Sequence, residues 1–358
     1  MIELDGSYGE GGGAILRVAL AASVLSQKPF RITDIRKNRP NPGLKPQHLH
    51  GVNAAQEISS AFVDGCALGS TKLEFVPRQF SPKNLNIDMG TAGSITLLTQ
   101  SILLPLMFSP RPVRLKLHGG TDVAFSPSMD YFLNVFLPNL AVLAEAKATL
   151  IRRGYYPKGG GELELKLKPR YPITDFENTE ALRECLRSKH MISLTGPVKP
   201  VQIRGVSHAS SDLQKNSVAE RQARAAKHSL SGLNLPVKTD SEYSDTLSTG
   251  SGITVWLQYF DDKSERTLRL GNDALGERSK RAEQVGQEAG EGLAEDFATG
   301  AFADRYLADQ ILPYMAFIGS GKIHAARISG HCLSNIYVLE KFFDVRFKVD
   351  SRLNIIEI

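Results

Sequence analysis

The sequence repeats one pattern three times, and this repetition is the feature that most constrains its fold. Each copy reads as a helix, a strand, a second helix and two further strands. The first copy falls within about 1–82 and the second within about 83–168, and the helices of the third begin near Ala303. We therefore expect an α/β (α+β) fold of three units, each a four-stranded sheet with two helices, packed around a common centre.

Apolar residues recur at helical spacing in each copy, which places two amphipathic helices there. Equivalent positions that differ between copies become candidates for chemistry, because the scaffold alone does not require them. The predicted helices span 14–27 and 46–62 in the first copy, 95–108 and 126–146 in the second, and 304–318 and 331–343 in the third.

A stretch between the second and third copies differs in character. From about 205 to 299 the sequence is polar and rich in Gly and Ser. The economical interpretation is that strand 201–206, which follows a strand at 191–196, begins the third copy and is interrupted by an inserted domain. This gives one repeat-built domain of 1–204 and 300–358, and a smaller domain of 205–299.

Composition restricts the class of protein only mildly. The net charge of +5 favours an anionic partner such as a nucleotide or nucleic acid. The three cysteines (Cys66, Cys185 and Cys332) lack the spacing of a zinc site, so free thiols and a cytoplasmic location are expected. The N-terminal residues show no signal-peptide pattern, and the longest apolar run is too short to cross a membrane.

The first motif is a glycine run, Gly11 to Gly13, that follows Glu10 between a short strand and a helix. Such a run lets backbone N–H groups and the positive helix end approach a phosphate. It is not a P-loop, because no Gly-Lys-Ser/Thr follows, and a tight structural turn explains it equally well. Glu10 favours the functional interpretation, because a carboxylate beside a phosphate site usually holds a divalent metal.

A basic cluster lies in the first copy and has no counterpart at the same place in the second. Two arginines three residues apart, followed by Gln-His at a helix start, suit a phosphate clamp. A solvated loop is the alternative for any cluster of charges. The residues concerned are Arg17, Arg36, Arg39, Lys45, Gln47 and His48.

His331 opens the second helix of the third copy, where the other copies have Pro46/Gln47 and Ser126/Pro127. The helix macrodipole disfavours an imidazolium there, so the ring should be neutral near pH 7. A neutral imidazole nitrogen is a competent nucleophile toward phosphorus. A histidine that caps the helix or is satisfied in the core is the alternative.

Two further segments admit functional and structural interpretations. Tyr306, Asp309 and Gln310 share one helix and could face a ligand, although Tyr306 could equally be buried in a core. The connection 153–161 reads as a tight hairpin between two strands of the second copy, with a structural role.

Seven stretches together resemble the RNA 3'-terminal phosphate cyclases: DGSYGEGGGAILR, IRKNRPNPGLKPQHL, GTAGS, HGGTD, RGYYPKGGGE, YLADQ and SGHCLSN. The similarity covers nearly the whole chain and is densest outside 205–299, and RGYYPKGGGE fits the family's own signature. The resemblance implies three repeats of two helices on a four-stranded sheet, with a smaller inserted α/β domain of thioredoxin-like topology.

The resemblance also implies an activity that needs ATP and a divalent cation (Mg²⁺ or Mn²⁺). An RNA 3'-phosphate is converted to a 2',3'-cyclic phosphodiester. The family's nucleophilic histidine falls on His331, which would attack the α-phosphate of ATP and form histidine–AMP with release of pyrophosphate. AMP would pass to the RNA 3'-phosphate as RNA(3')pp(5')A, and the 2'-OH would then expel it. The family leaves a homodimer possible.

The match assigns expected roles to the remaining site residues. Glu10 would help to hold the metal, and the phosphates would be handled by Arg17, Arg36, Arg39 and His48. The residues expected to line the nucleotide site are Gln47, Gln100, Pro127, Tyr306, Asp309 and Gln310, with Asp309 on the ribose.

Two other classes compete with this interpretation. Eukaryotic relatives of the family act in ribosome assembly without the nucleophile and would be non-catalytic, RNA-binding proteins. Glu10 and His331 are both present here, which argues for the enzyme. Enolpyruvyl transferases also repeat a sheet with two helices, but that similarity rests on fold analogy alone.

Overall fold

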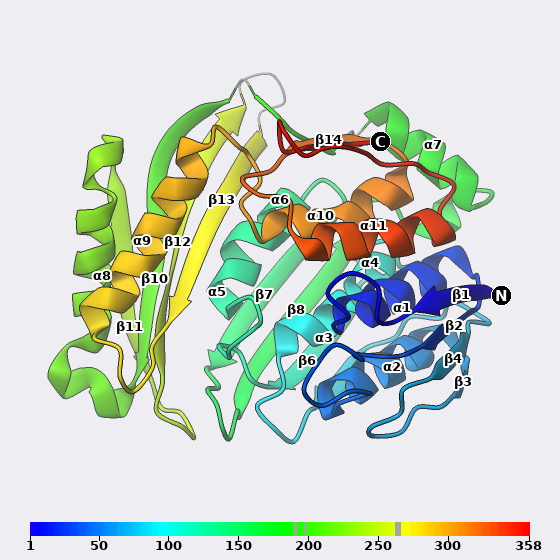
Figure 1. Ribbon diagram of the computed structural model, residues 1–358, viewed down its shortest axis with the longest axis horizontal. Helices are drawn as coiled ribbons and strands as arrows, with labels where there is room; N and C mark the ends of the chain where they lie inside the picture. Colours follow the sequence, from blue (N-terminus) through cyan, green and yellow to red (C-terminus); the bar gives the residue numbers. More distant parts are fainter. Residues whose placement is uncertain (190–191, 197, 262–265) are drawn as a thin grey trace.

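The computed structural model describes residues 1–189, 192–196, 198–261 and 266–358 (Figure 1). Three of its four-stranded sheets have the same strand order, with a parallel pair at one edge followed by two antiparallel neighbours. The threefold repeat predicted from the sequence is therefore confirmed. The sheets are β1 (Ile2–Asp5), β2 (Phe30–Thr33), β4 (Leu73–Val76) and β3 (Phe62–Asp64); β5 (Leu85–Asp88), β6 (Val113–Gly119), β8 (Gly161–Pro169) and β7 (Ala144–Arg152); and β9 (Ile192–Leu194), β14 (Gly321–His324), β16 (Ile355–Glu357) and β15 (Lys348–Asp350).

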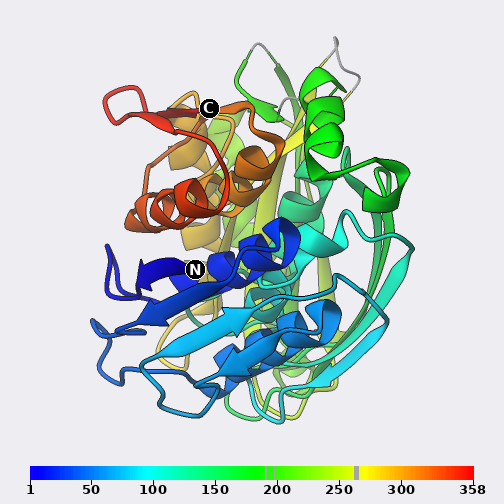
Figure 2. The same ribbon diagram turned by 90° about the vertical axis from the view of Figure 1, so that its right-hand side faces the viewer.

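The helices of the three repeats meet at the centre. α1 contacts helices of all three units, namely α2, α3, α4, α10 and α11. In Figure 2 the blue strands of the first sheet face the viewer, and the orange to red helices of the third repeat lie above them. The repeat helices are α1 (Ala14–Ser26), α2 (Pro46–Ser59), α3 (Ile95–Gln100), α4 (Leu103–Leu106), α5 (Met129–Tyr131), the π-helical η1 (Phe132–Phe136), α6 (Leu137–Asn139), α10 (Leu307–Ile318) and α11 (Gly330–Phe342).

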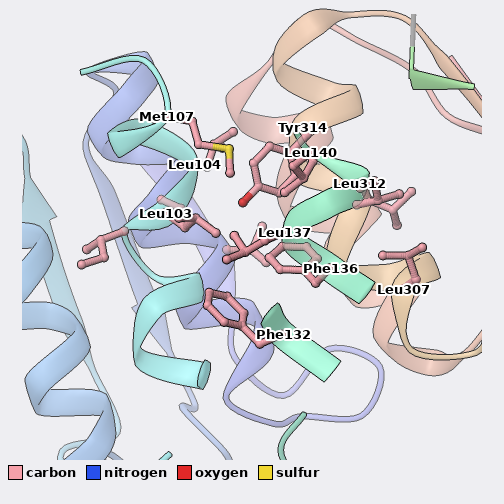
Figure 3. Packing of buried hydrophobic residues seen from close by; sticks show 14 of the residues in the cluster. Leu103, Leu104, Met107, Phe132, Phe136, Leu137, Leu140, Leu307, Leu312 and Tyr314 are labelled. Carbon is pink, nitrogen blue, oxygen red and sulfur yellow. The ribbon is translucent and has the colours of Figure 1, made fainter. Parts of the chain in front are cut away.

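A continuous apolar core joins these helices (Figure 3). Phe136 of the second repeat meets Tyr314 of the third with ring centroids 6.1 Å apart, and Leu104 and Leu312 are buried in the same cluster. Burial of each such side chain contributes about 1.5–3 kcal/mol, so the repeats are held together by their helices. The site described below lies where three of these helices begin.

Two predicted helices of the second repeat differ from the structure. The prediction for 95–108 was one helix, but it divides into α3 and α4, because Pro105 cannot donate to the carbonyl of Ser101. The prediction for 126–146 was too long: α6 ends at Asn139 and β7 begins at Ala144. Pairing with β8 over the length of β7 overrides the helix propensity of its alanines.

The same proline effect explains the π-helical turn. Pro138 lacks the N–H that would bond to the carbonyl of Asn134 in an α-helix. Arg269, from the inserted sheet, donates to that carbonyl from Nη1 at 2.6 Å. The carbonyl oxygen of Asn134, which Pro138 leaves unpaired, thus binds the second repeat to the insertion.

The fourth sheet has a different order, β11-β10-β12-β13, with only β10 and β11 parallel. Two helices cover one face, and the other face packs against α5, η1 and α6 of the second repeat. In Figure 1 the two covering helices, α8 and α9, lie at the far left, away from the repeats. The elements are β10 (Lys199–Ser210), β11 (Val237–Ser244), β12 (Ser251–Asp261), β13 (Arg266–Leu275), α8 (Val218–Ser229) and α9 (Ala282–Ala298).

The prediction that strand 201–206 begins the third copy was wrong. Residues 201–206 belong to β10 of the fourth sheet, whereas β9, within the predicted strand 191–196, pairs in parallel with β14. Met191 and Pro197 lie outside the described residues. The expected domain limit at 205 falls inside β10, and a thioredoxin-like topology for the insertion stays a prediction. A helix not predicted from the sequence, α7 (Thr179–Lys189), precedes β9, and short 3₁₀ turns occupy η2 (Ile173–Asp175), η3 (Ser211–Asn216) and η4 (Ser231–Leu233).

Candidate active site

The glycine run joins β1 to α1 and lets several side chains approach the backbone. Gly11 has φ +57°, a left-handed conformation that favours glycine. At Gly13 a Cβ atom would lie 2.4 Å from Nε2 of His48 and 3.1 Å from Nη1 of Arg17. A side chain at Gly13 would therefore displace both residues, and the loop brings the start of α1 to the start of α2.

Glu10 and His331 form the centre of the site. Nε2 of His331 lies 2.9 Å from Oε2 of Glu10, and both side chains are a little over one-third exposed. Nη2 of Arg39 lies 3.8 Å from the same carboxylate oxygen. The structure thus joins three of the predicted residues from the first and third repeats at one place that solvent can reach.

His331 is the second residue of α11, and the helix start holds it in position. The hydroxyl of the N-cap residue Ser329 accepts the backbone N–H of Cys332 at 3.3 Å, which satisfies one of the free donors of the first turn. Burial lowers the pKa of His331, against the opposing effect of Glu10, and the positive charges of Arg17 and Arg39 lower it further. The ring is therefore neutral near pH 7, as the sequence predicts, although burial is the main cause.

The basic loop places its two arginines differently. Arg36 has φ +58°, and its Nη1 donates to the carbonyls of Asn41 at 2.7 Å and Gly43 at 3.0 Å. These bonds fix the loop, so part of the guanidinium of Arg36 is already engaged. Arg39 is exposed and makes only its long contact with Glu10 among the ion pairs of the described residues, so it is the freer of the two.

His48 is buried at the third position of α2. Its Nδ1 accepts the backbone N–H of Lys45 at 3.0 Å, as the third residue does in a capping box. Burial, with the charges of Arg17, Arg36 and Lys45, lowers the pKa of His48 to about 3. The ring is neutral, and because Nδ1 accepts, Nε2 carries the hydrogen and points toward the glycine run.

A chain of hydrogen bonds crosses all three repeats behind these groups. Nε of Arg17 donates to Oε1 of Gln100 at 3.3 Å, and Nε2 of Gln100 donates to Oε1 of Gln310 at 3.2 Å. Nε2 of Gln310 in turn donates to the carbonyl of Tyr306 at 2.9 Å. Arg17, Gln47 and His48 also line one small pocket at the junction of α1, α2 and α3.

Asp309 lies beside Arg17 on the first turn of α10. Burial raises the pKa of Asp309 to about 7, against the opposing effect of Arg17. Tyr306, one turn earlier, is exposed and packs edge-on against Tyr131 with centroids 6.2 Å apart. Its ring is thus not buried in a core, which was the structural alternative.

Two predicted residues make their hydrogen bonds with the start of α3 rather than with His331. Oε1 of Gln47 accepts the backbone N–H of Ser94 at 3.4 Å. The carbonyl of Pro127 accepts the hydroxyl of Thr96 at 2.9 Å. They belong to the side of the site that the second repeat supplies.

Sequence reasoning missed residues that hold the site in shape. Nδ2 of Asn38 donates to the carbonyl of Ser7 and ties the basic loop to the glycine run. Nδ2 of Asn335 donates to the carbonyl of Asp309 at 2.9 Å and ties α11 to α10. Both asparagines sit within the family-like stretches, which is the only signal that could have pointed to them.

The carboxylate of Glu10 is suited to a divalent cation that also binds phosphate. Mg²⁺ in nucleotide sites is commonly held by one or two carboxylates together with phosphate oxygens and water. Glu10 offers one carboxylate that is partly exposed, and the positive charges of Arg39 and Arg17 lie near it or near His331. The residues present therefore fit such an ion.

Comparisons with known proteins identify the family of the chain. The model of the family RNA 3'-terminal phosphate cyclase matches residues 8–349. The chain is 42% identical over 356 residues to the RNA 3'-terminal phosphate cyclase of Pyrococcus abyssi, covering 99% of this chain and 96% of the relative. It is 40% identical over 360 residues to the protein of that name from Methanosarcina barkeri (100% and 99%) and 41% identical over 352 residues to that from Pyrobaculum neutrophilum (98% and 95%).

Proposed function

Because the chain belongs to the RNA 3'-terminal phosphate cyclase family, we propose that it converts an RNA 3'-terminal phosphate to a 2',3'-cyclic phosphodiester with ATP. The strongest support is the neutral imidazole of His331, which faces Glu10 at the start of α11 with Arg39 beside it. A nucleophile, a metal-binding carboxylate and a phosphate-binding cation are the groups that nucleotidyl transfer requires.

His331 acts first. The contact of Nε2 with Glu10 at 2.9 Å is given up when ATP binds, and with the proton on Nδ1 the lone pair of Nε2 attacks the α-phosphorus of ATP. The bond from that phosphorus to the oxygen bridging to the β-phosphate breaks, and pyrophosphate leaves with the electron pair. The product is a phosphoramidate that joins His331 to AMP. Lowering of the pKa of His331 by burial keeps this lone pair available near pH 7.

The RNA takes over the nucleotide in the second step. An oxygen of its 3'-phosphate attacks the same phosphorus, and the P–N bond breaks with its electrons returning to Nε2. The RNA(3')pp(5')A so formed has AMP as a good leaving group. The adjacent 2'-OH attacks the 3'-phosphorus and loses its proton to water, AMP departs with the electron pair of the P–O bond that breaks, and the cyclic phosphodiester remains. Three moderate steps thereby replace one difficult displacement from a phosphate monoester.

The surrounding residues stabilise charge on the phosphates. Arg17, Arg39 and the free part of Arg36 supply positive charge, and the neutral His48 donates from Nε2–H. Glu10 would hold Mg²⁺ or Mn²⁺, which would neutralise phosphate charge when bound. Gln47, Gln100, Pro127, Tyr306, Asp309 and Gln310 would line the adenosine site, with Asp309 accepting from the ribose.

The proposed partners are therefore ATP and an RNA that carries a 3'-phosphate, and a cytoplasmic location and a homodimer stay predictions. No helix in the described part of the chain is long and apolar enough to cross a membrane. A non-catalytic, RNA-binding role in ribosome assembly is the competing function. The presence of both Glu10 and His331, in contact, favours the enzyme.

Labelling with α-³²P-ATP and Mg²⁺ or Mn²⁺ tests the proposal. We expect the chain to acquire one acid-labile, base-stable label, and an RNA 3'-phosphate chase to remove it with appearance of the cyclic end. His324→Gln, a histidine of β14 in the same repeat, is the matched control and should label normally. A chain that takes up no label with either cation would refute the covalent mechanism and favour the RNA-binding alternative.

A further inference from the structure

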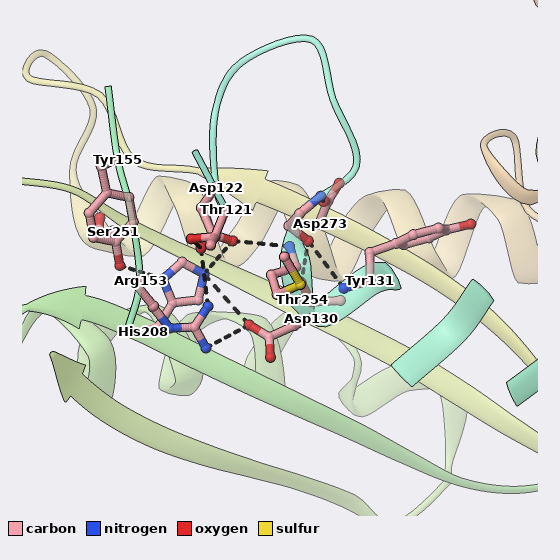
Figure 4. A network of polar contacts seen from close by, with 12 residues as sticks. Thr121, Asp122, Asp130, Tyr131, Arg153, Tyr155, His208, Ser251, Thr254 and Asp273 are labelled. Atoms are coloured by element: carbon pink, nitrogen blue, oxygen red, sulfur yellow. Dashed lines mark hydrogen bonds and ion pairs between the residues drawn. The ribbon is translucent and has the colours of Figure 1, made fainter. Parts of the chain in front are cut away.

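A second group of chemically reactive side chains lies where the second repeat meets the insertion (Figure 4). Asp122 and Asp130 come from the segment between β6 and η1, and His208 comes from β10 of the fourth sheet. Their exposed fractions are 3%, 5% and 0%. None of the three takes part in the function proposed above, so their burial together needs its own explanation.

The three side chains converge on one point. Nε2 of His208 lies 3.5 Å from Oδ1 of Asp122 and 3.8 Å from Oδ2 of Asp130. One ligand atom from each residue lies within 4.8 Å of the others, and no other group of three histidine, cysteine or acidic residues in the described ranges does so. A tetrahedral zinc ion with bonds of about 2.0–2.2 Å separates its ligands by about 3.4 Å, close to two of these spacings.

The imidazole is oriented toward the carboxylates and lacks a partner there. Nε2 of His208 is fully buried and makes no hydrogen bond. Nδ1 pairs with the hydroxyl of Tyr155 at 2.8 Å, so the ring cannot turn to satisfy Nε2 elsewhere. A hydrogen bond to the far nitrogen is how proteins commonly orient a metal-binding histidine. With the proton on Nδ1, the lone pair of Nε2 points at both aspartates.

The charges of the cluster do not balance. Two buried carboxylates, Asp122 and Asp130, and the half-exposed Glu242 surround the single guanidinium of Arg153. Uncompensated negative charge is costly in a buried site, and a divalent cation would neutralise it.

We propose that Asp122, Asp130 and His208 bind a divalent transition-metal ion that joins the insertion to the second repeat. One imidazole and two carboxylates suit Zn²⁺, with Mn²⁺ as second choice, whereas Mg²⁺ prefers six oxygens in an octahedron. The other oxygen of Asp122 is held by the hydroxyl of Thr121 at 2.7 Å and by Arg153, so the ligand is fixed from outside. This site is independent of the cation at Glu10, and its role is structural.

Metal content tests the proposal without reference to catalysis. The full chain is expressed in medium supplemented with Zn²⁺ or, separately, Mn²⁺, because a buried site fills during folding. After gel filtration against a chelator, we expect about one equivalent of Zn²⁺ per chain by mass spectrometry. Glu10→Gln and His324→Gln should retain it, and His208→Gln and Asp130→Asn should lower it at least tenfold.

The outcomes separate this site from the catalytic one. Loss of the metal in Glu10→Gln but not in His208→Gln would overturn the proposal, as would an unaltered chain with less than about a tenth of an equivalent of either metal. If the His208 variant does not fold, crystals of the unaltered chain decide. An anomalous difference peak among the three side chains, at the absorption edge of the metal, is then the expected result, and its absence would refute the site.

Discussion

Asp130 and His331 occupy the same position in two repeats and have very different surroundings, although the sequence alone aligns Ser126/Pro127 with His331. Each is the second residue of the helix that opens the second half of its repeat. Each follows a serine, Ser128 or Ser329, whose hydroxyl caps the helix by accepting an N–H at 3.3 Å. Asp130 is buried beneath the insertion, whereas the side chain of His331 is 40% exposed.

The difference shows that the role of a residue at this position depends on whether neighbouring elements bury its side chain, and not on the repeated scaffold. In the third repeat the start of α11 leaves the side chain of His331 40% exposed to solvent. In the second repeat β10 and β12 lie over the same position, and its carboxylate is enclosed with Arg153 and His208. One position is therefore suited to chemistry with a ligand and the other to holding two parts of the chain together.

Replacing His331 should have the largest effect on activity and none on folding. In His331→Asn the attacking lone pair is lost, so the rate of labelling by ATP should fall by at least roughly 10³-fold. The side chain is partly exposed and its one close contact is with Glu10, so the melting temperature should change by no more than a few degrees. Labelling kinetics and calorimetry on the same preparation measure both.

Replacing Arg153 should lower the stability of the chain strongly and affect the labelling of His331 little. Its guanidinium is buried and contacts Asp122, Asp130 and Glu242, so Arg153→Met takes the arginine away from two buried carboxylates. We expect a loss of about 3–5 kcal/mol in the free energy of unfolding, measured with urea. Below the melting temperature of the variant, labelling of His331 should persist within a factor of a few.

Arg153→Lys is the matched test of geometry. Lysine keeps the charge but cannot reach several carboxylates with a planar fork, so it should recover only part of the lost stability. Equal stability of the lysine variant and the unaltered chain would show that charge alone matters there. A loss of labelling as large as the His331 variant shows would break the comparison, because the two regions would then act as one.

The sequence predicted the repeats well because their signals are local. The apolar spacing in 14–27 and 46–62 requires no knowledge of distant residues, and the structure has α1 and α2 there. Where tertiary pairing overrides local preference the prediction failed: the alanine-rich stretch from Ala144 pairs with β8, and residues 201–206 join the fourth sheet.

The site around His331 can be predicted from local sequence motifs, whereas the cluster around Arg153 cannot. Glu10, Arg39 and His331 lie in motifs that a family resemblance can find. Asp122, Arg153 and His208 are separated by up to 86 residues, and their sequence spacing gives no sign of a metal site or a buried ion network. Residues 153–161 were interpreted as a hairpin with a structural role, which fits Arg153 but does not reveal its partners. Asp122 and Arg153 meet within the second repeat, and the packing of the insertion adds His208 to them.

Arg39→Ala tests the comparison at the solvent-accessible site around His331. The guanidinium is exposed and its only ion pair among the described residues, with Glu10, is long, so the free energy of unfolding should change by less than about 0.5 kcal/mol. Loss of one preorganised phosphate contact should lower the labelling rate by about 10²-fold. Arg31→Ala is the control, because Arg31 makes a shorter pair with Glu74 and lies away from the site; its labelling should be normal. Equal losses of rate and stability in Arg39→Ala would make that arginine structural.

His48 gives the smallest expected effect; it is the third residue of α2, the matching helix of the first repeat, and at 6% exposed it is about as buried as Asp130. Its pKa is lowered to about 3 in the folded chain and is about 6.5 when unfolded, so the unfolded state alone gains a proton as the pH falls below about 6.5. Stability is therefore lost over that range, by about 2 kcal/mol between pH 7.5 and pH 5 from this group. His48→Gln removes the titrating ring, and glutamine at this position can still accept the N–H of Lys45 as in a capping box. Relative to the unaltered chain, the variant should gain about 2 kcal/mol on going from pH 7.5 to pH 5 in urea unfolding. His48→Ala should show the same trend with pH, with a free energy of unfolding that is lower by about 1 kcal/mol because the cap is lost. A difference in the free energy of unfolding between His48→Gln and the unaltered chain that does not vary with pH would contradict the prediction. It would mean that the buried ring takes up its proton without cost, and that the start of α2 is as open as that of α11.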